Sequence, residues 1–206
     1  MLLLNFLPLT HLALVVVLLA WPWAAAGWRA LGALAALYLL PPLLARGLLL
    51  TRPFRDTHIA LDAPEFLRWW TLWCLQALFC RWPFLEEGLR LVPGLYSLWL
   101  RLWGARVGRL TYWAPGLLIL DRPFLDIGND VLFGAGVRLN PHVIAPDENG
   151  QMQLLLATVK IGDGALIGGY ALLTAGTEIP PGECTRAYLI SPPFSRWENG
   201  RRLRDT

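Results

Sequence analysis

The chain has 206 residues, of which 55% are hydrophobic and 16% charged, with a formal net charge of +3 at pH 7. Soluble domains carry about 25% charged residues, so this composition excludes a disordered chain, argues against a purely soluble one, and leads us to expect no nucleic-acid partner. The three cysteines form no CxxC pair and the three histidines form no cluster, so we expect neither a disulfide framework nor a metal site.

The N-terminal region predicts a transmembrane helical hairpin. No Lys, Arg, Asp or Glu precedes Arg29, and the apolar run 6–23 approaches the roughly 20 residues that cross a bilayer. A second apolar run covers 28–50, and the short link between the runs has tryptophans at both ends, as interfacial anchors prefer. A cleavable signal peptide is the alternative, but no basic segment precedes the first run.

The positive charges around this hairpin predict its orientation. Arg46, Arg52 and Arg55 follow or end the second run, whereas the tip offers only Arg29. The positive-inside rule then places both termini in the cytoplasm. We therefore expect a multi-pass protein of a bacterial inner membrane, with the lipid bilayer as a partner and the rest of the chain on the cytoplasmic side.

Residues 64–103 predict two further helices with apolar and amphipathic character. The first begins near Pro64 and ends at Arg81-Trp82-Pro83, and the second runs from Leu89 to Trp103. Their pattern is typical of helices that lie in the membrane interface, and packing against the hairpin is the alternative. Most of the 19 glycines follow Gly104, so we divide the chain into a membrane-embedded and interfacial helical region, 1–104, and a second domain, 105–206.

The second domain carries a repeat with a period of six. Apolar residues recur at this spacing, a glycine often follows them, and Val107-Gly108 is a plausible earlier start. Such a period fits neither a helix nor a hairpin but a hexapeptide solenoid, in which three units make one coil. The fold class expected for the whole chain is therefore α+β. The recurring apolar positions are Ile127, Phe133, Leu139, Ile161, Ile167, Leu173 and Ile179.

The repeat breaks once and ends in a basic tail. Residues 145–160 form an excursion between coils, and a loop of that length in a compact fold is usually functional. His142 stands three residues before this excursion. The tail 196–204 is basic and is expected to leave the solenoid, either to touch anionic lipid headgroups or only to keep the terminus soluble.

The pattern over about 105–190 resembles the hexapeptide-repeat acyltransferases, which fold as left-handed parallel β-helices. Membrane-associated members and the domains that end some nonribosomal peptide synthetases share a lead-in that Leu95-Tyr-Ser-Leu-Trp-Leu-Arg-Leu-Trp-Gly-Ala-Arg-Val-Gly108 approximates. They also share Ile127-Gly-Asn-Asp130, His142 and Val159-Lys-Ile-Gly162. The resemblance implies acyl transfer from acetyl-CoA or another acyl-CoA, in a homotrimer with sites between subunits.

His142 is the candidate general base, with an ordinary surface histidine as the alternative. An imidazole titrates near neutral pH, so it can take a proton from a hydroxyl or amine that then attacks a thioester. A carboxylate would fix its tautomer, and Asp121, Asp147 and Glu148 are candidates. We favour Asp121, because the length of one coil places the residues near Phe124 directly below His142.

Four further residues are candidates for binding coenzyme A. Lys160, the only lysine, could meet the nucleotide phosphates, although a solvated lysine explains it as well. The resemblance implies that Gly168, Gly169 and Ala175 lie beside the pantetheine arm. The repeat itself explains the glycines equally.

Three other functions compete with this one. His142-x4-Asp147 matches one motif of a glycerolipid acyltransferase family but lacks its companion motifs. A γ-class carbonic anhydrase needs three histidines around zinc, and only His142 lies in the repeat. The remaining alternative is a non-catalytic scaffold subunit of a membrane complex. We expect instead an acyltransferase whose acceptor is a lipid or a lipid-linked molecule at the cytoplasmic face.

Overall fold

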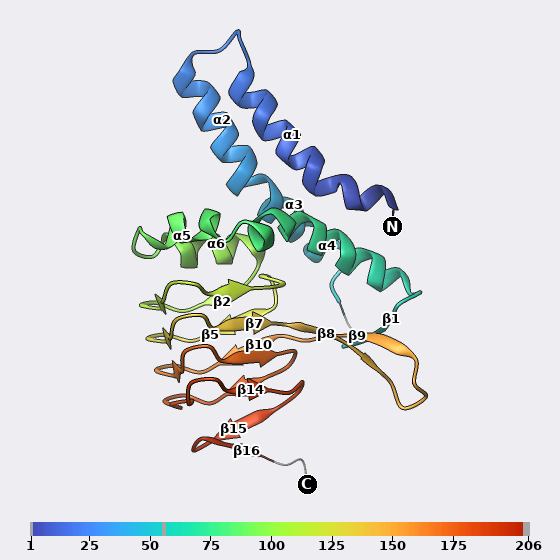
Figure 1. Ribbon diagram of the computed structural model, residues 1–206, viewed down its shortest axis with the longest axis vertical. Coiled ribbons are helices and arrows are strands. Elements are labelled where there is room, and N and C mark those ends of the chain that lie inside the picture. Colours follow the sequence, from blue (N-terminus) through green and yellow to red (C-terminus); the bar gives the residue numbers. More distant parts are fainter. Residues whose placement is uncertain (1, 55–56, 204–206) are drawn as a thin grey trace.

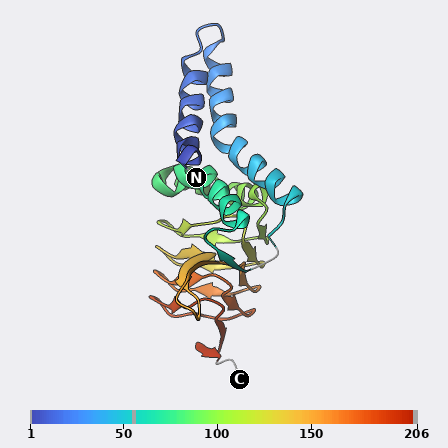
Figure 2. The ribbon, with the colours of Figure 1, turned by 90° about the vertical axis from the view of Figure 1, so that its right-hand side faces the viewer.

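The first half of the chain is helical in the computed structural model, which describes residues 2–54 and 57–203. Arg55 and Arg204, which the sequence predictions use, lie outside those residues. Figures 1 and 2 show that two antiparallel helices project from one end of the molecule as a hairpin. The elements of this N-terminal part are η1 (Leu2–Phe6), α1 (Leu7–Ala20), α2 (Ala26–Tyr38) and α3 (Leu40–Thr51).

Two N-terminal helical stretches, Leu2–Ala20 and Ala26–Thr51, are long and apolar enough to cross a membrane. The second stretch contains a break at Leu39, because Pro42 has no N–H to donate to the carbonyl of Tyr38. The indole Nε1 of Trp99 donates to that carbonyl instead, at 2.8 Å. His11 does not face the site described below, since its Nε2 donates to the carbonyl of Ala36 within the hairpin, at 2.9 Å.

A layer of helices separates the hairpin from the strands (Figure 1). Its first helix starts at Pro64 and ends at Arg81, as the sequence predicts, but half of its residues are buried. The second predicted helix, 89–103, is wrong as a continuous element. Pro93-Gly94 interrupts it, because Gly94 adopts a φ of +78° that a helix does not allow. The layer consists of α4 (Pro64–Arg81), α5 (Phe84–Arg90) and α6 (Leu95–Trp103).

The second half consists of short strands in three parallel sheets, which the chain visits in turn. The α+β class is therefore confirmed, with apolar N-terminal helices and sheets of parallel strands. One sheet holds β2 (Arg106–Val107), β5 (Leu125–Ile127), β10 (Val159–Ile161), β13 (Glu178–Ile179) and β15 (Arg196–Glu198), with β16 (Arg201–Leu203) antiparallel at its edge. The others hold β3 (Tyr112–Trp113), β6 (Leu132–Phe133) and β11 (Leu166–Ile167), and β4 (Leu118–Ile119), β7 (Arg138–Asn140), β12 (Leu172–Thr174) and β14 (Ile190–Ser191).

The register of these sheets shows where the repeat is regular. Lys160 pairs with Glu178, the residue that lies three units of the repeat further along the chain. Arg106 pairs with Asp126, which lies two positions beyond the residue that three units would reach. The first pass of the chain through the three sheets is therefore two residues longer than a regular pass, and the second pass contains the excursion. The additional residues lie between β4 and β5, in the segment that includes Asp121.

The repeat also continues beyond Ile179, where its apolar signal ends. The next inward positions are Thr185 and Ser191, which are buried despite being polar. The expectation that the basic tail leaves the repeat is wrong for its first residues. Arg196–Glu198 forms the fifth parallel strand of its sheet, because the inward side chain of Trp197 packs against the core and donates to Ser191 Oγ at 2.8 Å.

The excursion is an antiparallel hairpin that extends to one side of the sheets (Figure 1). It consists of β8 (His142–Pro146) and β9 (Met152–Leu156), and β1 (His58–Ala60) pairs with its far edge. The excursion thus begins at His142 rather than at 145. Lys160, expected at its end, lies in β10, because parallel pairing has already resumed at Val159.

Candidate active site

His142 and Asp121 meet where the chain leaves the parallel sheets. His142 is the first residue of β8, and Asp121 lies in the turn between β4 and β5. The imidazole Nδ1 hydrogen-bonds the carboxylate Oδ2 of Asp121. Asp121 is fully buried, whereas 16% of the His142 side chain remains exposed. Of the three carboxylates considered for this role, the structure therefore pairs His142 with Asp121.

The backbone of Asp121 adopts a conformation that few side-chain-bearing residues accept. Its φ is +49°, in the left-handed region where aspartate is among the tolerated residues. The tight turn closes when the N–H of Phe124 donates to the carbonyl of Asp121, at 2.9 Å. The additional residues of the first pass thus create the bend that carries the carboxylate.

Asp147 and Glu148, the other two candidate carboxylates, make no hydrogen bond to His142 in the described structure. They lie in the turn of the β8–β9 hairpin, where Asp147 Oδ1 accepts the backbone N–H groups of Asn149 and Gln151, both at 2.8 Å. An aspartate that bonds its own backbone two residues on is typical of turns. His142-x4-Asp147 therefore brings together no catalytic pair.

Helix α4 supplies the rest of the environment of the dyad. The indole Nε1 of Trp69 donates to Asp121 Oδ1 at 2.8 Å, so both carboxylate oxygens are occupied. The rings of Trp69 and Trp73 stand edge-on to the imidazole, with centroids 4.8 and 5.5 Å from its own. The sequence indicates that this helix is aromatic, but nothing in its pattern indicates that two of its tryptophans meet a histidine far along the chain.

The hydrogen bonds of the dyad determine what the imidazole can do. A carboxylate only accepts hydrogen bonds, so the proton of a neutral imidazole stays on Nδ1 and the lone pair is on Nε2. Within the residues that the structure describes, Nε2 has no hydrogen-bond partner. This is the arrangement in which a histidine can take a proton from a bound hydroxyl or amine.

The next residue, Arg122, anchors this turn to α4. It is fully buried, and Gln76 Oε1 accepts both its backbone N–H, at 2.8 Å, and its Nη1, at 3.1 Å. Gln76 Nε2 donates to the carbonyl of Leu72, which leaves the amide oxygen directed at Arg122. Trp69 and Gln76 are two helical turns apart, so one face of α4 holds both Asp121 and Arg122.

The charge of Arg122 is balanced by Glu86 of α5. Its Nη2 donates to Glu86 Oε1, and the other carboxylate oxygen accepts Tyr96 Oη and, at 3.0 Å, Arg90 Nη2. Burial, the largest single influence, lowers the pKa of Arg122, but the carboxylate of Glu86, together with Cys80 and Tyr96, outweighs it, so the pKa is raised. Burial and the same carboxylate raise the pKa of Tyr96 well above its ordinary value. Arg122 therefore stays charged and Tyr96 neutral.

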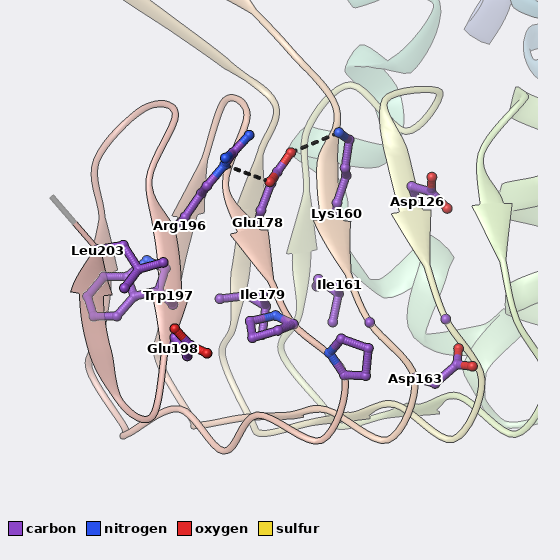
Figure 3. A pocket seen from close by; sticks show the side chains of 14 residues that line it. Asp126, Lys160, Ile161, Asp163, Glu178, Ile179, Arg196, Trp197, Glu198 and Leu203 are labelled. Atoms are coloured by element: carbon purple, nitrogen blue, oxygen red, sulfur yellow. Dashed lines mark hydrogen bonds and ion pairs between the residues drawn. The ribbon is translucent and has the colours of Figure 1, made fainter. Parts of the chain in front are cut away.

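Lys160 lines a shallow cavity of about 710 Å³ (Figure 3), and neither dyad residue is among the residues that line it. Its Nζ donates to Glu178 Oε1 at 2.8 Å, and Arg196 Nε approaches the other oxygen of Glu178 at 2.9 Å. Asp126, Asp163 and Glu198 line the same cavity. A phosphate group would have to displace Glu178 here and face further carboxylates, so its proposed contact with Lys160 stays a prediction that this geometry does not favour.

Gly168, Gly169 and Ala175 are packed by neighbouring passes of the chain. A Cβ at Gly168 would collide with the backbone of Arg186 and Ala187, so the stacking of the strands requires glycine there. Gly169 is partly buried, and Ala175 is fully buried. Ala175 follows β12 and His142 follows β7, which belong to the same sheet, whereas the two glycines follow β11 in another sheet. Their role beside pantetheine stays a prediction.

Comparisons with known proteins give little beyond this geometry. No family model and no curated protein matches the chain. It is similar in structure to a hexapeptide-repeat-containing acetyltransferase from Vibrio cholerae, with 17% identity and a TM-score of 0.40 over 63% of this chain and 90% of the other. It is also similar to a maltose O-acetyltransferase from Clostridium difficile 630, with 13% identity and a TM-score of 0.27 over 68% and 86%. At these scores, the function must be argued from the chain itself.

Proposed function

We propose that the chain is a membrane-anchored acyltransferase that moves an acyl group, in the first place acetyl, from coenzyme A to a hydroxyl or amine. The observation that carries the proposal is the buried Asp121 carboxylate on Nδ1 of His142, with Nε2 left open. We take His142 as the general base and Asp121 as the residue that orients it. No other group of the described chain combines a base, an orienting carboxylate and partial exposure.

The proposed reaction needs one base and an oxyanion donor. Nε2 of His142 takes the proton of the acceptor hydroxyl or amine, whose oxygen or nitrogen attacks the thioester carbonyl. A backbone N–H can hold the oxyanion. The carbon–sulfur bond then breaks, and the imidazolium returns its proton to the leaving thiolate. Asp121 stabilises the imidazolium during this interval.

The fold of the transfer unit belongs to the same proposal. We infer that the three parallel sheets are the faces of a left-handed parallel β-helix of the hexapeptide-repeat type, similar to the terminal domains of some nonribosomal peptide synthetases. The register of three units between neighbouring strands after the excursion and the long insertion at His142 support this. In such a family the active unit is a homotrimer with coenzyme A between subunits, which we propose here as well.

The acceptor that we propose is a lipid or a lipid-linked molecule. Two N-terminal helices are apolar enough to span a membrane, and the dyad lies against α4 of the helical layer from which they project. A reaction on a freely soluble acceptor would not require this position. We propose the inner membrane of a bacterium, with residues 1–104 as the anchor and 105–206 on the cytoplasmic side.

Substitution of the two dyad residues tests the proposal. Purified full-length protein in detergent would be supplied with labelled acetyl-CoA and a bacterial lipid extract. We expect His142→Ala to lower the rate by about 10²- to 10⁴-fold, the usual contribution of a general base, and Asp121→Asn to lower it comparably because the tautomer is lost. His58→Ala, which removes an exposed histidine of β1, is the control.

A non-catalytic scaffold is the second candidate, favoured by the two tryptophans that leave only 16% of the His142 side chain exposed. It predicts no acyl transfer and no binding of coenzyme A to the solubilised protein. Acyl transfer that survives His142→Ala unchanged would instead contradict the assignment of the base. A protein that is not an enzyme and an enzyme that uses a different base would therefore give different results.

A further inference from the structure

A second cavity, of about 690 Å³, lies between the α5–α6 turn and the first pass of the parallel sheets. Neither dyad residue lines it. Three of its lining residues are arginines, Arg90, Arg101 and Arg109, and among the residues that the structure describes no aspartate or glutamate lines it. A concave surface with one sign of charge attracts ligands of the opposite sign. Because Arg90 is paired with Glu86 and Glu87, the net positive charge of the cavity comes from Arg101 and Arg109, and the cavity favours an anion.

Two of these arginines are held in place and one is free to move. Arg101 donates from Nε and Nη2 to the carbonyls of Val107 and Gly108, both at 2.9 Å, which fixes its guanidinium in the wall. Arg90 is fixed by Glu86 and Glu87. Arg109 is exposed, and its side chain has no ion pair or hydrogen bond to any residue that the structure describes. The cavity thus has two fixed guanidinium groups, and a third, that of Arg109, that can move.

The wall also contains two buried polar atoms without partners. Arg90 Nε and Thr111 Oγ1 are shielded from solvent and make no hydrogen bond with the described part of the chain. Only 4% of the Arg90 side chain is exposed. Buried donors of this kind are rare in proteins because each costs free energy. Both atoms can donate, so a ligand rich in acceptor oxygens, such as a phosphate, would satisfy them after a small shift.

The rim of the cavity is apolar and exposed. Leu91, beside it, and Leu110, which lines it, are 84% and 82% exposed, and Val92 and Pro93 continue this surface. Exposed aliphatic side chains next to arginines are typical of a surface that meets lipid headgroups and the first methylenes of their chains. The cavity borders α6, in the layer from which the membrane hairpin projects (Figure 1).

We propose that this cavity binds the phosphate headgroup of an anionic membrane lipid. Arg101 and Arg109 contact the phosphate oxygens, Arg90 and Thr111 form the back of the site, and the lipid chains lie over the exposed leucines. The assignment rests on the proposed membrane anchor but not on the proposed acyl transfer, because it involves neither residue of the dyad.

Lipid titration of the full-length protein in detergent tests the site. Native mass spectrometry would compare short-chain phosphatidylglycerol, short-chain phosphatidylcholine and inorganic phosphate. We expect phosphatidylglycerol to bind at least ten times more tightly than either of the other two. Arg109→Glu should weaken this binding about tenfold or more, and Thr111→Val about threefold. Arg138→Glu, the same charge change at an exposed position of β7, should leave it unchanged.

Three results would overturn the proposal. Equal affinities for the two lipids would show that charge is not recognised. Inorganic phosphate that binds as tightly as phosphatidylglycerol would exclude a lipid ligand. Equal losses in Arg109→Glu and Arg138→Glu would mean that only the net charge of the protein matters. Arg109 is exposed, so its substitution does not endanger folding, and Thr111→Val keeps the side-chain volume.

Discussion

The two ends of the parallel-strand region bury polar side chains in different ways. At the end next to the helices, the interior receives full charges, those of Asp121 and Arg122, and their partners come from α4 and α5. At the far end, the interior receives hydroxyl groups, those of Thr177 and Ser191, which bond one another at 2.9 Å. Buried ion pairs rarely add net stability over apolar residues of the same size, so stability alone does not explain the charged end. The proposed dyad, which needs an oriented carboxylate, would explain it.

Among these buried polar groups, we expect substitution of Glu86 to cause the largest loss of folding stability. Glu86→Gln removes the charge that balances Arg122 and leaves a buried guanidinium without its counter-ion. Loss of one partner of a buried pair typically costs about 3–5 kcal/mol. Unfolding of the detergent-solubilised protein by heat or denaturant would measure this loss in the free energy of unfolding.

The adjacent residue provides the control for that measurement. Glu87 pairs with Arg90 at 2.6 Å but is 36% exposed, so water and the remaining amide oxygen can replace its charge. We expect Glu87→Gln to cost about 1 kcal/mol or less. Similar losses in the two variants would show that the charged end is not held by the buried pair.

A smaller effect is predicted at the far end. Ser191 Oγ accepts Trp197 Nε1 at 2.8 Å and bonds Thr177 Oγ1. Ser191→Ala leaves the buried Thr177 hydroxyl and the partly buried Trp197 indole without this partner, which costs about 1–3 kcal/mol. Thr177→Val should cost little more when it is added to Ser191→Ala, because its partner is already gone. A double-mutant cycle in thermal unfolding would check this, and additive losses would contradict the shared network.

How much could be predicted from the sequence depends on whether the inward side chains are apolar or polar. The repeat shows its period wherever the inward residues are apolar, so the passes from Ile127 to Ile179 are predictable. The last pass is missed because the polar residues Thr185 and Ser191 interrupt the apolar pattern. Asp121 is the partner that the length of one coil predicts for His142, although the first pass is two residues longer than a regular one. Trp69 and Gln76 could not be found, because contacts between a helix and a turn follow no period.

The smallest predicted effect is on the outside of the sheets, at Glu178. A hydrogen bond from Lys160, together with the charges of Lys160 and Arg196, holds the pKa of Glu178 below its ordinary value. A carboxyl whose pKa is lower in the folded state stabilises the fold above its unfolded pKa, and this contribution is lost as the pH falls through the folded value. The side chain is 34% exposed, so solvent limits the contribution to about 1 kcal/mol or less. Melting temperatures of the wild type and Glu178→Gln should therefore differ slightly near pH 6 and converge toward pH 3, and a difference that grows in acid would contradict the assignment.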